Sequence, residues 1–188
     1  MASQSLRAFV ALEVPGEVRA PLGRGIDHLR SRLPRARWVR AEGVHLTLKF
    51  LGESEHGRLD RLGGALRPRV AGFGPVSVAL GVGGFFPTPA RARVAWVGGA
   101  AEGAVEIAAA VDDAANRLGW ERERRRWKPH LTLARLDRPW PPGAADEFLA
   151  YWREHALPAF ECVEIVLMSS RLGPGGAVYT PIERFSLE

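Results

Sequence analysis

The sequence predicts an α+β fold with two halves of similar design. Segments with strand and helix patterns follow the order β-α-β-α-β-β-α-β-α-β-β along 188 residues. The two halves have a similar order, and each contains one strand-like His-Leu-Thr-Leu tetrapeptide. A chain of this length has room for one domain, and no low-complexity linker divides it. We therefore expect residues 1–188 to form a single domain made of two lobes.

The first half contains two predicted strands, each followed by a predicted helix. Apolar residues alternate along residues 6–14, as in a strand. They then recur at spacings of three and four over residues 18–33, which gives a helix one apolar face. Pro21 is expected in the first turn of this helix, where proline is tolerated. The pattern repeats with a strand over residues 44–51 and a helix over residues 59–70.

The second half begins with two short predicted strands, residues 76–80 and 93–97. The residues between them are rich in glycine and proline, and we expect them to form a loop. A helix over residues 102–118 follows, and Gly119 is its C-terminal stop. The remaining predicted elements are a strand over 130–136, a helix around 148–152, and two closing strands, 160–169 and 178–182, joined by a turn at 173–176.

Composition excludes several classes of protein. Hydrophobic residues make up 46% and charged residues 25%, which is typical of a globular protein and not of a disordered one. Cys162 is the single cysteine, so the chain has neither an intramolecular disulfide nor a cysteine-based zinc site. We expect no secretory signal and no membrane-spanning segment, and hence a cytoplasmic location.

Positive charge comes almost entirely from arginine. The chain has 26 basic and 21 acidic residues, and Lys49 and Lys128 are its only lysines. Arginine suits planar contacts with phosphate, although these arginines are spread along the whole chain. The formal net charge of +5 favours a polyanionic partner without identifying it.

The most informative feature is the repeated tetrapeptide at residues 45–48 and 130–133. With five histidines and four threonines in the chain, two identical copies are improbable by chance. Side chains two residues apart on a strand project from the same face. Each His-Thr pair is therefore expected on one face, while the leucines and Phe50 point the opposite way, toward the core.

Two such pairs facing each other across a cleft suit acid–base chemistry at phosphorus. One neutral imidazole can take a proton from an attacking water or hydroxyl, and one imidazolium can protonate the leaving oxygen. The threonine hydroxyls can hold the other phosphate oxygens. We expect no metal and no cofactor, because no cluster of carboxylates or histidines has metal-ligand spacing. We expect no catalytic role for the other histidines, His28, His56 and His155, which fall on or near helices.

With these motifs, the chain resembles the 2H phosphoesterase superfamily, and more closely its RNA 2′,3′-cyclic phosphodiesterases, formerly described as 2′-5′ RNA ligases. The resemblance covers nearly the full length and includes Phe-Leu-Gly-Glu after the first motif and Lys-Pro before the second. It implies a bilobal, pseudo-twofold fold in which two antiparallel sheets line a central cleft and helices lie outside. It also implies intertwined lobes and metal-independent hydrolysis of a terminal 2′,3′-cyclic phosphate to a 2′-phosphate.

The resemblance also implies roles for single residues. His45 would be the proton donor and His130 the proton acceptor, while Thr47 and Thr132 would bind phosphate. Arg135 is a further candidate for binding the substrate, although strict alternation places it on the face opposite His130, so that it needs a bulge or the end of the strand to reach the cleft.

Two further residues are candidates for binding the substrate. Lys49 is one because it shares the alternation of His45 and Thr47. Phe9 is the other, as a stacking face; its alternative is a buried position in the core.

Other functions remain open at this point. The same site could act as a 2′-5′ RNA ligase when a 5′-hydroxyl replaces water, and a binding module for RNA or nucleotides would use the cleft without turnover. The expected partners are RNA 3′ ends or nucleotide 2′,3′-cyclic phosphates, bound by a monomer that does not associate with membranes. The charged segment 121–126 is either a rim for RNA or a solvated loop.

Overall fold

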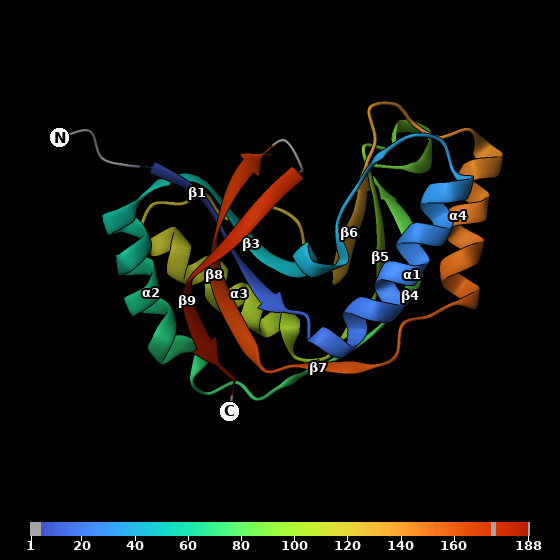
Figure 1. Ribbon diagram of the computed structural model, residues 1–188. Coiled ribbons are helices and arrows are strands. Elements are labelled where there is room, and N and C mark those ends of the chain that lie inside the picture. Colours follow the sequence, from blue (N-terminus) through green and yellow to red (C-terminus); the bar gives the residue numbers. More distant parts are fainter. Residues whose placement is uncertain (1–4, 174–175, 188) are drawn as a thin grey trace.

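Two antiparallel sheets form the framework of the computed structural model, which describes residues 5–173 and 176–187 (Figure 1). The first sheet has the strand order β3-β1-β8-β9, and the second has the order β2-β6-β5-β4-β7. This confirms the predicted α+β class with two antiparallel sheets. The strands are β1 (Ser5–Glu13), β2 (Arg37–Trp38), β3 (His45–Glu55), β4 (Val76–Phe86), β5 (Val94–Ala101), β6 (His130–Arg135), β7 (Phe160–Cys162), β8 (Glu164–Gly173) and β9 (Gly176–Ser186).

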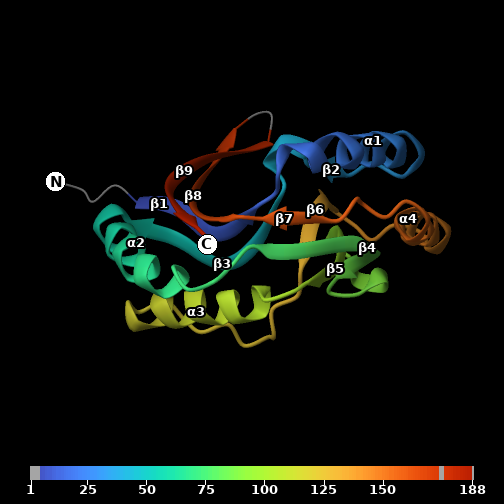
Figure 2. The same ribbon diagram turned by 90° about the horizontal axis from the view of Figure 1, so that it is seen from below.

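Four α-helices lie on the outside of the two sheets (Figures 1 and 2). They are α1 (Gly16–Arg32), α2 (His56–Val70), α3 (Ala104–Arg117) and α4 (Pro142–Glu154), and two short 3-10 helices are η1 (Ala41–Gly43) and η2 (Pro89–Arg91). No helix in the described ranges is long and apolar enough to cross a membrane.

Two helices, α1 and α3, each follow a strand of one sheet and pack beside the other sheet. Helix α1 follows β1 of the first sheet, yet it packs against α4 beside the second sheet (Figure 1). The contact is close, because a Cβ at Gly25 would lie 2.7 Å from Trp152 of α4. Conversely, α3 follows β5 of the second sheet and packs beside α2 of the first lobe, where Arg58 donates to the carbonyl of Leu118 at 3.0 Å. Helices α1 and α3 thus each pack beside the sheet that does not contain the strand before them.

The first part of the segment expected to be a loop, residues 81–86, is strand instead, while residues 87–93 form the connection that contains η2. Strand β4 continues to Phe86, and its glycines allow close packing rather than a turn. The indole of Trp96, on β5, lies flat over Gly84, where a Cβ would come within 2.1 Å of the ring. Composition alone therefore gave the wrong structure for these residues.

Two smaller differences concern prolines and a turn. Helix α1 begins at Gly16, earlier than expected, so Pro21 lies in its second turn and not in the first. Pro174 and Gly175 of the expected closing turn lie outside the described residues.

Candidate active site

His45 and His130 are the first residues of β3 and β6, which come together between the two sheets (Figure 1). The two rings are held in the same way. His45 Nδ1 lies 2.9 Å from the carbonyl oxygen of Gly43, and His130 Nδ1 lies 2.8 Å from that of Lys128. Because a carbonyl oxygen only accepts, each Nδ1 carries the proton. Each neutral ring therefore leaves Nε2 as its free, basic atom.

Aromatic side chains fix both imidazoles. Phe9 of β1 stacks on His45 with ring centroids 4.4 Å apart, and Tyr179 of β9 meets His45 edge-on at 4.9 Å. His130 is contacted edge-on by Phe86 at 4.9 Å, and Trp96 packs further out. Phe9 is only 3% exposed, so it supports the ring of His45 more than it offers a free surface.

The pKa values of both histidines are lowered. Burial lowers the pKa of His45 from 6.5 to about 4 against the opposing effect of its bond to Gly43, and the charges of His130 and Arg135 lower it further. Burial also lowers the pKa of His130, with its bond to Lys128 opposing the change. The neutral form of both rings therefore predominates at pH 7 in the free protein.

A β-bulge follows the threonine in each motif strand. On β3, Ala11 pairs with Thr47 while its neighbour Val10 pairs with Lys49, so Leu48 is an extra residue. On β6, the corresponding extra residue is Leu133, between the partners of Trp96 and Ala95. The two bulges lie at equivalent positions of the repeat. Before each bulge, the histidine and threonine share a face, as predicted; after it, the alternation is reversed.

The reversal moves three side chains to the faces opposite to those that simple alternation predicts. Arg135 returns to the face of His130 and Thr132, which satisfies the condition set for its reaching the cleft. Phe50, expected in the core, is 58% exposed and lies on the face of Phe9. Lys49 turns away from His45, so the expectation that it shares that face is wrong.

Lys49 is buried in the first lobe, where it has two partners. It is 2% exposed, and its Nζ lies 2.6 Å from Oδ1 of Asp112 on α3. It also donates to the carbonyl of Glu121. This arrangement ties the middle of β3 to α3 and to the following loop, and it holds Lys49 away from the face that carries His45 and Thr47. We therefore assign it a structural role and omit it from the site.

The segment between α3 and β6 runs along the open edge of β3 and is bonded to it. The indole of Trp127 donates to the carbonyl of Thr47 at 2.6 Å, and the indole of Trp120 donates to the carbonyl of Leu51 at 3.0 Å. Neither contact was predicted from the sequence, and of the rings beside the histidines only Phe9 was. The available signal was weak: Trp127 lies three residues before His130, and Trp96 lies between glycines in the folded sheet.

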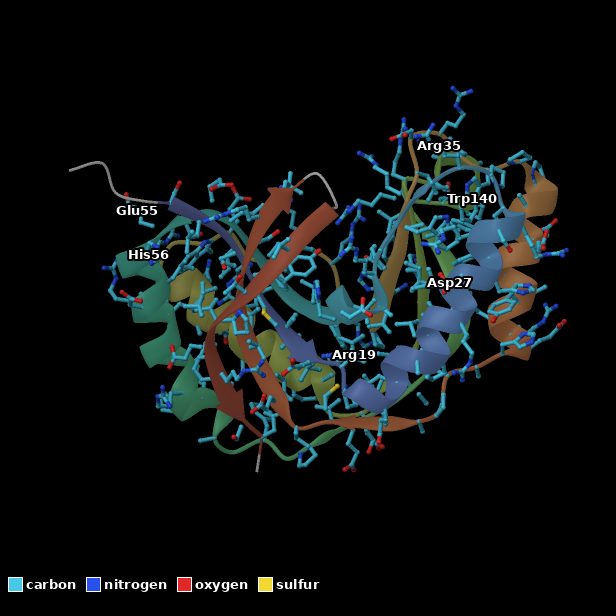
Figure 3. All side chains as sticks on the ribbon, viewed as in Figure 1. Arg19, Asp27, Arg35, Glu55, His56 and Trp140 are labelled. Atoms are coloured by element: carbon cyan, nitrogen blue, oxygen red, sulfur yellow. The ribbon has the colours of Figure 1, made fainter. Side chains whose placement is uncertain are left out.

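The remaining histidines lie away from the two motifs. His56 begins α2 at the outer end of the first lobe (Figure 3). His28 and His155 stack on either side of Tyr151, on the surface formed by α1 and α4. Many arginines also lie away from the two motifs and point into solvent, as Arg35 does in Figure 3.

Comparison with known proteins identifies the family of the chain. The family model of the 2′-5′ RNA ligase superfamily matches residues 15–174. An RNA 2′,3′-cyclic phosphodiesterase of Methanothermobacter thermautotrophicus is 30% identical, with 97% of this chain and 99% of the relative covered. One of Thermus thermophilus is 33% identical, with 97% and 90% covered.

Solved structures show the same fold. Escherichia coli LigT complexed with 3′-AMP has a TM-score of 0.73 and 27% identity, with 98% of this chain and 99% of LigT covered. A Thermus thermophilus protein has a TM-score of 0.77 and 28% identity, with 97% and 98% covered. Two sheets with exchanged helices, two equivalently held histidines and a match over most of the length agree: the chain belongs to the 2′-5′ RNA ligase superfamily.

Proposed function

We propose that the protein is an RNA 2′,3′-cyclic phosphodiesterase that hydrolyses a terminal 2′,3′-cyclic phosphate to a 2′-phosphate. The names of its relatives and the family match support this reaction class. The observation that carries it to this chain is the pair of imidazoles, each with Nδ1 bonded to a carbonyl and Nε2 free. Such a pair supplies one base and one acid at a shared phosphate.

In the proposed reaction, Nε2 of His130 takes a proton from water as the water oxygen attacks phosphorus. The bond between phosphorus and the 3′ oxygen breaks, and protonated His45 gives its proton to that oxygen. The products are a 2′-phosphate and a 3′-hydroxyl, with His130 protonated and His45 neutral. Exchange of protons with solvent restores the starting state.

Because the pKa of His45 is lowered, the ring must gain a proton before it can act as the acid. In the free protein this ring is neutral at pH 7. The acid in the reaction, however, must be protonated before it can give a proton to the leaving oxygen. A bound phosphate carries a negative charge, and an adjacent anion raises the pKa of an imidazole. Binding of the substrate therefore favours the protonated form of His45 at the moment when that form is required.

Thr47, Thr132 and Arg135 are proposed to bind the phosphate. Both hydroxyls and the guanidinium lie on the faces that carry the histidines, and these groups donate hydrogen bonds to the non-bridging oxygens. Phe9 holds the ring of His45 in place by stacking. Both motifs lie in one chain, so we propose that a monomer is active.

The experiment is mass analysis of the product formed from a short RNA that ends in a 2′,3′-cyclic phosphate, with a chelator present. We expect the mass of the RNA to increase by one water. We also expect a phosphatase specific for 3′-phosphates to leave the product unchanged, because its phosphate is on the 2′ oxygen. Activity that appears only after addition of a divalent metal would contradict the metal-independent mechanism. Adding an RNA with a 5′-hydroxyl end tests the ligase alternative, which a dominant joined product would favour. Tight binding without any product would favour a binding module.

A further inference from the structure

Phe50 is an exposed aromatic ring beside the proposed site. Its side chain is 58% exposed, although aromatic rings are ordinarily buried. Its ring lies 6.2 Å from that of Phe9, which stacks on His45 at 4.4 Å. Phe9 therefore connects the ring of Phe50 to that of His45, and Phe50 is the exposed ring of the three. The two distances keep the rings of His45 and Phe50 within about 11 Å of each other.

A cavity of about 620 Å³ opens beside Phe50, between the edge of β3 and the segment that follows α3. Its strand side is formed by residues 49–52, and its other side by residues 120–125. Bonds from Trp120 and Lys49 hold the two sides together. The cavity is therefore a built part of the fold, with Phe50 on the side of the reaction centre.

Charged side chains of this segment line the cavity, and they differ in their partners. Arg122 lies 2.6 Å from Asp113 and is thus neutralised. Arg124 and Arg125 form no ion pair within the described residues, so both guanidinium groups are free to meet an anion. Glu121 and Glu123 also line the cavity and weaken its positive potential. The charges of this cavity alone would therefore attract an anion only weakly, and binding of a ligand also requires contact with the exposed ring of Phe50.

We propose that Phe50, Arg124 and Arg125 bind the nucleotide on the 5′ side of the terminal, cyclic nucleotide of an RNA substrate. Its base stacks on Phe50, and its phosphodiester meets the two arginines. An aromatic face and free guanidinium groups are the groups that bind single-stranded RNA without reading its sequence. The inference rests on the proposed function, and it predicts a preference for oligonucleotides over mononucleotides.

The test compares kcat/KM for adenosine 2′,3′-cyclic phosphate with that for a trinucleotide ending in the same group. We expect wild-type protein to prefer the trinucleotide. Phe50→Leu should lower kcat/KM for the trinucleotide roughly tenfold, as expected for loss of one stacked base, and leave the mononucleotide within about twofold. Phe50→Trp keeps the ring and should retain the preference.

The arginines are tested by the double variant Arg124→Gln/Arg125→Gln. It should lower kcat/KM for the trinucleotide and reduce its dependence on salt, because fewer phosphate contacts are formed. Arg153→Gln, on the outer helix α4, is the matched control and should leave kcat/KM for both substrates unchanged.

The outcomes separate the two hypotheses. Equal kcat/KM for both substrates in wild-type protein, or an equal loss for both in Phe50→Leu, would overturn the nucleotide site while the phosphodiesterase function stands. Absence of hydrolysis of either substrate would overturn the proposed function, and the inference with it.

Discussion

The indole of Trp127 donates a hydrogen bond to the main-chain carbonyl of Thr47 at 2.6 Å. This bond joins the segment just before the second motif to the strand of the first motif. Because β3 is an edge strand, the carbonyl of Thr47 would otherwise lack a strand partner. The contact therefore fixes the two histidine strands relative to each other, across the gap between the sheets.

We predict that Trp127→Phe impairs turnover more than folding. The variant keeps the ring and loses the hydrogen bond, which is worth about 1 kcal/mol in stability. Because small displacements of catalytic groups are costly, kcat should fall roughly tenfold or more for mononucleotide and oligonucleotide alike. Steady-state kinetics and urea unfolding measure the two effects.

The control is Trp120→Phe, which removes the corresponding bond to Leu51 further along β3. It should cost similar stability and leave kcat for the cyclic mononucleotide within about twofold. Equal losses of kcat in the two variants would show that general loosening of the β3 edge, and not alignment of the motifs, explains the result.

Replacing either histidine by alanine should abolish hydrolysis with the fold retained. Loss of a general acid or base lowers the rate by roughly 10²–10⁴-fold. Circular dichroism and thermal unfolding should remain close to those of the wild-type protein, because both histidines are the first residues of their strands and are only partly buried. Wild-type turnover by either folded variant would refute the mechanism.

The dependence of activity on pH follows from the lowered pKa values. The base acts when neutral, and burial lowers the pKa of His130, so its neutral form predominates above pH 6.5. The acid acts when protonated, and the pKa of His45 is about 4, so its active fraction falls as pH rises. We expect kcat/KM, which reports on the free enzyme, to be highest on the acid side of pH 6.5 and to decrease above it.

The measurement is kcat/KM for a cyclic mononucleotide between pH 4.5 and 9. The optimum of kcat should lie at higher pH than that of kcat/KM, since bound phosphate raises the pKa of His45. A value of kcat/KM that rises from pH 6.5 to 8 would be incompatible with these assignments.

Arg135→Gln should change both binding and titration. The charge of Arg135 lowers the pKa of His45, so its removal should raise that pKa. Loss of a charged hydrogen bond to phosphate should raise KM roughly tenfold. NMR titration of the His45 ring measures the first effect, and Arg153→Gln again serves as control. An unchanged titration would place Arg135 outside the site.

The pair Lys49–Asp112 should govern stability and not binding of the substrate. Lys49→Met leaves the carboxylate of Asp112 without its buried partner, and such changes cost about 3–5 kcal/mol. Urea unfolding should show this loss, while KM of the folded protein stays unchanged. The double variant Lys49→Met/Asp112→Leu should recover much of the stability. A raised KM with normal stability in Lys49→Met would show that Lys49 binds the substrate and would contradict its structural role.

Periodicity predicted the strands and helices well because burial of one face leaves a regular trace in the sequence. It identified the strands of His45 and His130 and the shared face of each His-Thr pair. It failed one residue after each threonine, where a bulge reverses the alternation. A bulge is set by the pairing of neighbouring strands, β1 with β3 and β5 with β6, and sequence period alone does not contain that information.

Long-range contacts account for the other misses. The ring stacked on His45 comes from β1, and the buried partner of Lys49 comes from α3, 63 residues away. Glycines between residues 81 and 91 suggested a loop, but Gly84 is required by the indole that covers it. In each case the residue type was visible in the sequence, and its neighbour was decided only by the tertiary fold.

The exchange of α1 and α3 has a consequence for cutting the chain. A polypeptide ending near residue 72 would hold β1, β3 and α2, but its first sheet would lack β8 and β9, and α1 would have no partner. Neither half is thus a self-sufficient folding unit, despite the repeat. Two separately expressed fragments should stay unstructured alone and regain structure when mixed, so complementation of fragments would be the physical signature of the exchange.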